Sequence, residues 1–189
     1  VVSFNVSADE LESRSLYSLR RSLNALTHED ITVRKVEQRE PGFSARFDAQ
    51  WREYHYHICL DDTPPLFMRD FSWFVHADLD MNAMQQAARH LEGEHDFKSF
   101  CSSRSQVENT VRTITDITID KAGDMIHIRI SGNGFLYNMV RIIVGTLMKI
   151  GLGIWPEDCM ESILAAKDRT KAGPKAEAKG LTLVEIKYL

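Results

Sequence analysis

The stretch GNGFLYNMVRIIVGTL (residues 132–147) leads into the most apolar helix that the 189-residue sequence predicts. Its apolar side chains favour a buried helix from Phe135 to Ile150, which Gly151 would end. The lead-in Gly132-Asn133-Gly134 is too short for a phosphate-binding fingerprint. It predicts instead a turn, or a close approach of two backbone segments, before the helix.

Arg141 interrupts this apolar helix, and a guanidinium in such a place needs a partner. Breaking a buried ion pair costs about 3–5 kcal/mol, so buried charges are tolerated when they are paired. One interpretation puts Arg141 on the hydrated side of the helix or against a structural carboxylate. The other is functional, because its planar fork suits a catalytic carboxylate or a phosphate. The residues alone leave both interpretations open.

The pattern on either side of this helix predicts an α+β fold, with mostly antiparallel strands and helices packed on one side. Apolar spacing predicts a helix over Leu16–Leu26, one that Asp80 caps, and one that ends near Lys167. Residues 167–180 are rich in Lys, Ala and Gly, which is typical of a mobile basic loop. Strands are expected over Val1–Val6, Ile31–Val33, Phe43–Phe47, Glu53–Leu60, Val111–Ile119, Met125–Ile130 and Leu181–Tyr188.

The strand predicted over residues 53–60 has two different faces. Tyr54 and Tyr56 share one face, which either packs in the core or stacks on unpaired bases. His55, His57 and Cys59 share the other face, and all three residue types bind zinc. Alternate side chains of a strand lie about 7 Å apart, too far for three of them to reach one ion without distortion. An ordinary exposed sheet face is therefore expected there, and no metal site is predicted.

Composition limits the function further. The sequence is 43% hydrophobic and 26% charged, as in an ordinary globular protein. Its net charge of -4 is uneven, since residues 135–189 sum to +2 and the rest to -6, so a phosphate-binding surface would have to be local. The 3 cysteines are odd in number and lack CxxC spacing, which predicts a reducing compartment, by default the cytoplasm. No apolar run approaches the ~20 residues that span a bilayer, so no membrane partner is expected.

Residues 132–147 resemble the signature of the tRNA pseudouridine synthase A family. Four other stretches resemble that family in the same order: residues 43–47 with 52–56, 93–97 with 99–100, 111–114, and 178–181. The resemblance implies the pseudouridine synthase fold, two ferredoxin-like α+β halves whose strands join into one sheet with an RNA cleft across it. Residues 1–60 would be the remainder of an incomplete first half with connecting strands, and residues 61–189 the complete second half.

The resemblance also implies an activity. Members of the family isomerise uridine in the anticodon arm of tRNA, by breaking the bond between ribose and N1 and joining ribose to C5, without a cofactor. It further implies a homodimer that binds the tRNA anticodon stem-loop. By motif position, Arg141 would pair with the nucleophilic aspartate, Tyr54 would lie beside that pair, and Leu181 would line the uracil pocket. Further substrate contacts are expected from Arg46, Arg104, Asn133 and Phe135.

The sequence departs from the family at the nucleophile. The family's aspartate lies in a Gly-Arg-Thr-Asp-x-Gly-Val-His stretch, which this sequence does not contain. In the family that stretch precedes a strand similar to Val1–Val6, so the chain is expected to begin after the nucleophile and to be inactive by itself. Three acids near matching motifs stand in the wrong context to replace it: Asp48, Asp96 and Asp168.

Two other hypotheses stay open from the sequence. One is a non-catalytic RNA-binding module derived from the same fold. The other is a metal-dependent enzyme for small molecules that uses His55, His57 and Cys59, and it predicts bound zinc in the purified protein.

Overall fold

The computed structural model describes residues 1–7, 9, 13–105 and 107–188. The chain divides into two compact units, Val1–Asp48 and Ala49–Leu189. The first unit contains helix α2 (Leu16–Leu26), as predicted, which begins where the Ser15 hydroxyl accepts the Ser18 N–H at 3.2 Å. The division that the family resemblance suggests, at residue 60, stays a prediction.

Three predicted strands of the first unit are wrong: Val1–Val6, Ile31–Val33 and Phe43–Phe47 form no strand. A strand needs a backbone partner, whereas the Val33 N–H and C=O bond to the Asn24 side chain at 2.7 and 3.0 Å. Residues 43–47 curl into turns, because the Asp48 carboxylate accepts the Ser44 N–H at 2.7 Å. Local side-chain hydrogen bonds thus replace sheet pairing at residues 31–33 and 43–47.

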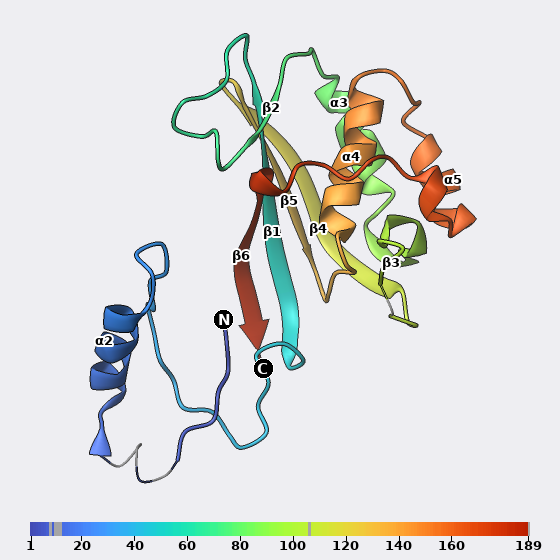
Figure 1. The fold of residues 1–189 in the computed structure, drawn as a ribbon. Helices are drawn as coiled ribbons and strands as arrows, with labels where there is room; N and C mark the ends of the chain where they lie inside the picture. Colours follow the sequence, from blue (N-terminus) through green and yellow to red (C-terminus); the bar gives the residue numbers. More distant parts are fainter. Residues whose placement is uncertain (8, 10–12, 106, 189) are drawn as a thin grey trace. The chain divides into compact units, whose positions relative to one another are not determined.

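The second unit is built on a six-stranded sheet of order β2-β1-β5-β4-β3, with β6 also paired to β1 (Figure 1). Among the strand pairs that the described residues form, β1–β2 alone is parallel. The mostly antiparallel α+β fold is therefore confirmed. The strands are β1 (Ala49–Leu60), β2 (Trp73–Val75), β3 (Gly93–Asp96), β4 (Val111–Ala122), β5 (Met125–Gly132) and β6 (Leu181–Tyr188).

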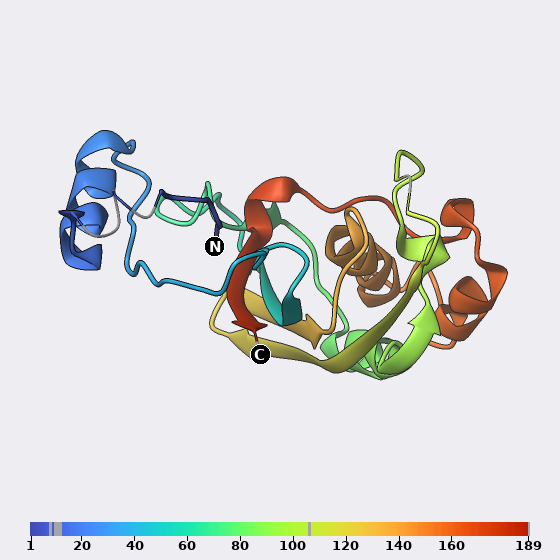
Figure 2. The ribbon, with the colours of Figure 1, turned by 90° about the horizontal axis from the view of Figure 1, so that it is seen from below.

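Helices α3 (Met81–Arg89) and α4 (Met139–Gly151) cover one face of this sheet, with α5 (Cys159–Ala166) beside them (Figures 1 and 2). The Asp80 carboxylate caps α3 by accepting the Ala83 N–H at 2.9 Å, as predicted. Short 3-10 turns follow at η1 (Lys98–Phe100), η2 (Arg169–Lys171) and η3 (Ala178–Gly180). None of the helices described has the length and apolarity to cross a bilayer.

Helix α4 starts four residues later than the apolar pattern predicts. Asn138, just before it, has the left-handed φ of 62°, which a right-handed helix cannot include. The lead-in at Gly132 behaves as predicted, since a Cβ there would lie 2.4 Å from the carbonyl oxygen of Thr113. The buried core between α4 and the sheet includes Ile128 and Ile130 of β5.

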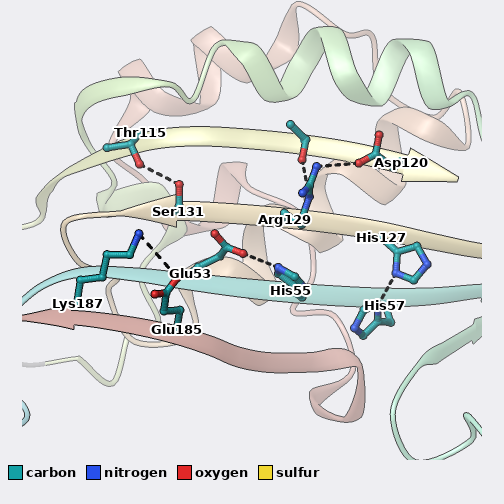
Figure 3. Close-up of polar contacts among 11 residues, drawn as sticks. Glu53, His55, His57, Thr115, Asp120, His127, Arg129, Ser131, Glu185 and Lys187 are labelled. Atoms are coloured by element: carbon teal, nitrogen blue, oxygen red, sulfur yellow. Dashed lines mark hydrogen bonds and ion pairs between the residues drawn. The ribbon is translucent and has the colours of Figure 1, made fainter. Parts of the chain in front are cut away.

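The alternation of β1 separates its two faces as the sequence predicts. Tyr56 and Ile58 are fully buried against the helices, in register with Ile128 and Ile126 of β5. His55 and His57 lie on the opposite face, which carries polar side chains of the neighbouring strands (Figure 3). The tyrosine face is therefore part of the core.

The segment between α5 and β6 packs on α4, so the prediction of a mobile basic loop is wrong for its middle part. Ala172 and Ala176 are buried, and the Gly173 N–H donates to the Thr146 hydroxyl at 2.9 Å. A Cβ on Gly145 would lie 1.7 Å from the carbonyl oxygen of Pro174. We call residues 172–177 the strap, because they cross the surface of α4 (Figure 1). The lysines of this region still face solvent.

The close approach of Gly145 to Pro174 predicts that a side chain at position 145 lowers the stability of the fold. Gly145→Ala should lower the free energy of unfolding by at least about 2 kcal/mol, because the new methyl group overlaps backbone that cannot move away by a rotamer change. Gly134→Ala is the matched control, since its Cβ would sit 3.4 Å from the Arg112 side chain, an ordinary contact. Urea unfolding of both variants measures the difference, and equal stabilities would refute the close approach.

Candidate active site

Arg141 lies in the first turn of α4, half-buried. Its Nε–H donates to the carbonyl of Ala176 at 2.7 Å, and the Ala176 N–H donates back to the Arg141 carbonyl at 3.0 Å. Its Nη1 reaches Asn138 Oδ1 at the long distance of 3.5 Å. No carboxylate of the described residues forms an ion pair with it. The guanidinium is thus fixed through one edge by neutral backbone, while its charge forms no ion pair with the described residues.

The same piece of strap holds a tyrosine. The hydroxyl of Tyr56 donates to the carbonyl of Glu177 at 2.7 Å. Burial is the main cause that raises the pKa of Tyr56 well above its usual value; Glu177 adds to the shift and Arg141 opposes it. Tyr56 and Arg141 therefore bind consecutive carbonyls of one short segment, and the phenol stays protonated.

Tyr54 and Phe135 meet on the same face of the sheet. Their rings lie edge to face, with centroids 5.1 Å apart and an interplanar angle of 84°. Burial raises the pKa of Tyr54, and the charge of Arg52 opposes that shift. Leu181 pairs across the β1–β6 ladder with Tyr56, so its side chain projects to the same face. Four of the predicted residues, Arg141, Tyr54, Phe135 and Leu181, thus belong to the helix-covered side of the sheet.

Asn133 has a structural task in this arrangement. Its Oδ1 accepts the Thr113 N–H at 2.9 Å, and its own N–H donates to the Thr113 carbonyl at 3.1 Å. Its carbonyl accepts Nη1 of Arg52 at 2.9 Å. These contacts fix the turn that leads from β5 toward Phe135, so Asn133 positions the neighbouring site residues through the backbone.

Two predicted substrate contacts, Arg104 and Arg46, are described within their own segments. Arg104 is exposed in the loop between η1 and β4. Arg46 belongs to the first unit, where its guanidinium lies over the Phe47 ring at 5.4 Å. Both stay predictions as RNA contacts.

The three acids that stand in the wrong sequence context are all engaged in structural contacts. Besides Asp48, these are Asp96, which accepts the Thr110 hydroxyl at 2.5 Å and pairs with Lys167 at 3.0 Å, and Asp168, which accepts the Thr170 N–H at 2.9 Å. The Thr110 hydrogen bond is the largest cause of the lowered pKa of Asp96. These contacts give each of the three carboxylates a local structural role.

The opposite face of the sheet carries a separate polar network (Figure 3). His57 and His127 are cross-strand partners whose Nδ1 atoms lie 2.9 Å apart, and His55 pairs with Glu53 at 2.7 Å. Arg129 bonds to the Thr118 hydroxyl and the Asp120 carboxylate, each at 3.1 Å. Within the described residues, no group of three or more His, Cys, Asp or Glu is arranged to hold a metal ion. Cys59, the third member of the zinc hypothesis, is buried.

Known proteins that are similar to this chain indicate its chemistry. Residues 87–189 match the family model described as tRNA pseudouridine synthase, which places the chain among isomerases that modify tRNA. It is 48% identical over 168 residues to tRNA pseudouridine synthase A of Brevibacillus brevis, and 42% identical over 167 residues to that of Bacillus subtilis. Each alignment covers 88% of this chain and 68% of the relative. The chain therefore belongs to the tRNA pseudouridine synthase family.

Sequence reasoning missed the residues that connect the site. The alternation of β1 groups Tyr56 with Tyr54, although of the two it is Tyr56 that bonds to the strap. It gives no sign that His127 is the partner of His57, because strand register is not visible in a single strand. The glycines at 145, 173 and 180 were the available signal, since a glycine within a helix or next to a strand often marks a close backbone approach.

The paired imidazoles generate a pH prediction. Burial, followed by the charges of His127 and His55, lowers the pKa of His57 below its usual 6.5. The unfolded chain therefore binds the proton more readily, so stability is fully present above pH 6.5 and falls as the pH drops through that value. His57→Gln should flatten the decline of the unfolding midpoint between about pH 7.5 and pH 5.5. An equally steep decline in the variant would count against this assignment.

Proposed function

We propose that this chain supplies the uridine-binding part of an enzyme that isomerises uridine to pseudouridine in the anticodon arm of tRNA. The observation that carries the proposal is Arg141, whose charge is half-buried and held by neutral carbonyls. A partly buried charge of this kind is stabilised by an anion beside it. In the proposed enzyme that anion is the nucleophilic aspartate, which the motifs of these 189 residues do not provide.

Arg141 has a clear chemical task in this proposal. Enclosing an aspartate with a base removes water from it, which raises its pKa and weakens it as a nucleophile. A paired guanidinium favours the ionised carboxylate and directs its oxygens. Whether the aspartate attacks the base or the sugar first, it must be charged and aimed.

The remaining residues would hold the base and the RNA. Tyr54, against Phe135, and Leu181, beside Tyr56, offer an aromatic and an aliphatic wall for uracil. Arg46 and Arg104 would contact phosphates, and Asn133 would fix the turn that leads from β5 to Phe135. The resemblance further supports a homodimer, and the family's reaction uses no cofactor. The free thiols of Cys59 and Cys101, both buried, support a cytoplasmic protein.

Substitution of Arg141 tests the proposal in a polypeptide that carries this chain together with the family's aspartate segment. Arg141→Ala should lower single-turnover pseudouridine formation by at least about 100-fold, the scale of losing one preorganised charge partner. Arg141→Lys should recover little, because lysine lacks the two-pronged grip. Affinity for tRNA should change little, since phosphate contacts over a larger surface supply it.

Lys149→Ala is the matched control, because it removes one positive charge from the other end of α4. Thermal unfolding of each variant separates loss of function from loss of fold. The 189 residues alone should form no pseudouridine, because a covalent mechanism fails without its nucleophile. A folded Arg141→Ala enzyme with near-native turnover would leave Arg141 a purely structural residue, and tRNA binding without any turnover in the complete polypeptide would favour the RNA-binding module.

The lysines around the strap should contribute to tRNA binding. Lys171, Lys175 and Lys179 are exposed, and Lys179 makes only an exposed pair with Glu177 at 3.2 Å. Replacing all three with glutamine should reduce the slope of log affinity against log salt concentration by about 2. The reason is that tRNA binding releases fewer counterions when fewer phosphates are contacted. Replacing Lys35, Lys98 and Lys121 removes the same charge elsewhere. If both triple variants keep the original slope, the strap lysines do not face the RNA.

A further inference from the structure

Tyr56 and Arg141 hold adjacent backbone groups of the strap from two different elements. The Tyr56 hydroxyl, on β1, binds the Glu177 carbonyl at 2.7 Å. Arg141, on α4, binds both polar groups of the preceding residue, with Nε to the Ala176 carbonyl at 2.7 Å and its carbonyl to the Ala176 N–H at 3.0 Å. The two carbonyls belong to neighbouring peptide planes that share the Cα of Glu177, so a displacement of one plane is passed to the other through that atom.

Tyr56 cannot move away from this contact. Its side chain is fully buried in the core, edge to face with Trp73 at 6.5 Å. A Cβ on Gly180 would lie 2.7 Å from the ring carbon that bears the hydroxyl, so the backbone of η3 closes over the phenol. The hydroxyl is thus a fixed point, set by the sheet rather than by the strap.

The other end of the strap is fixed independently. Thr146 accepts the Gly173 N–H at 2.9 Å, and Gly145 admits Pro174 by lacking a side chain. Ala176 lies between these two anchors. The direction of its carbonyl, and so the direction of the guanidinium that it binds, depends on both anchors.

We propose that Tyr56 is a positioning residue for the isomerisation, whose hydroxyl aims the Arg141 guanidinium through the backbone of Glu177 and Ala176. The inference rests on the proposed function for its chemical consequence, but its structural link can be measured without turnover. Burial keeps the phenol protonated, so Tyr56 acts as a fixed donor and not as an acid or base. Tyr54, in contrast, belongs to the proposed wall of the base site.

Tyr56→Phe tests the link, because it removes only the hydroxyl oxygen. In the 189-residue chain, the Arg141 Nε–H should exchange with solvent slowly, and at least about 10-fold faster in the variant, because the carbonyl that protects it is loosened. Ser99→Ala is the matched control. Ser99 is equally buried and also donates to a backbone carbonyl, that of Ile163 at 2.6 Å, so its loss should lower stability without changing Arg141.

The consequence for the reaction is measured in the polypeptide that includes the aspartate segment. Tyr56→Phe should lower the single-turnover rate at least about 10-fold while the Kd for tRNA stays within about twofold, as expected when a reacting group is misaimed. Ser99→Ala should keep the original rate. Faster exchange at Arg141 with an unchanged rate would overturn the positioning role.

Two further outcomes also overturn the inference and can be told apart. If Tyr56→Phe does not fold, the unmodified chain still decides, since an Arg141 Nε–H that exchanges as fast as that of exposed Arg89 would mean that the link is absent. If exchange behaves as expected but the unmodified polypeptide forms no pseudouridine, the proposed function fails, and the role in the reaction fails with it.

Discussion

The approach of the strap to α4 is the contact on which the site depends. Gly145 and Gly173 let two backbones come closer than any side chain would allow, and Thr146 joins them by a hydrogen bond. The strap then passes Arg141 and leads through η3 into β6. A bulkier residue at the contact would displace Arg141 and the start of β6 together. Packing between two elements thus determines where the charged group points.

The second constraint is electrostatic. A guanidinium has five N–H donors, and the described residues occupy two groups of Arg141, Nε firmly and Nη1 weakly. Neutral carbonyls replace part of the lost hydration without cancelling the charge. A carboxylate in the same place would have satisfied the arginine fully and removed its capacity to bind another anion. Partial compensation keeps the residue both fixed and available.

The sequence was sufficient where apolar residues recur with the period of a strand or of a helix. Alternation identified β1, β4, β5 and β6, and apolar spacing identified α2 and α4. It failed at residues 1–6, 31–33 and 43–47, because an alternating segment forms a strand only if a partner strand exists. At 31–33 and 43–47, local bonds to Asn24 and Asp48 took the place of that partner. It also failed at the start of α4, where the left-handed φ of Asn138 leaves no periodic trace.

For the site, too, the sequence indicated single residues but not the contacts between distant segments. Burial made Arg141 conspicuous in its own helix, and motif resemblance indicated Tyr54 and Leu181. The bond from Tyr56 to Glu177 joins residues 121 positions apart, so no local pattern could distinguish the two tyrosines. The pairing of His57 with His127 depends equally on register between strands.

The two faces of β1 limit how the number of residues in this strand can change. Tyr54 and Tyr56 face the helices and His55 and His57 face away because all four lie in one continuous register with β5. One residue inserted or deleted just before Tyr54 would turn the phenols outward and drive imidazoles into the core. In this strand a change of length would be more damaging than most changes of residue type, so natural variation here should consist of substitutions and leave the spacing untouched.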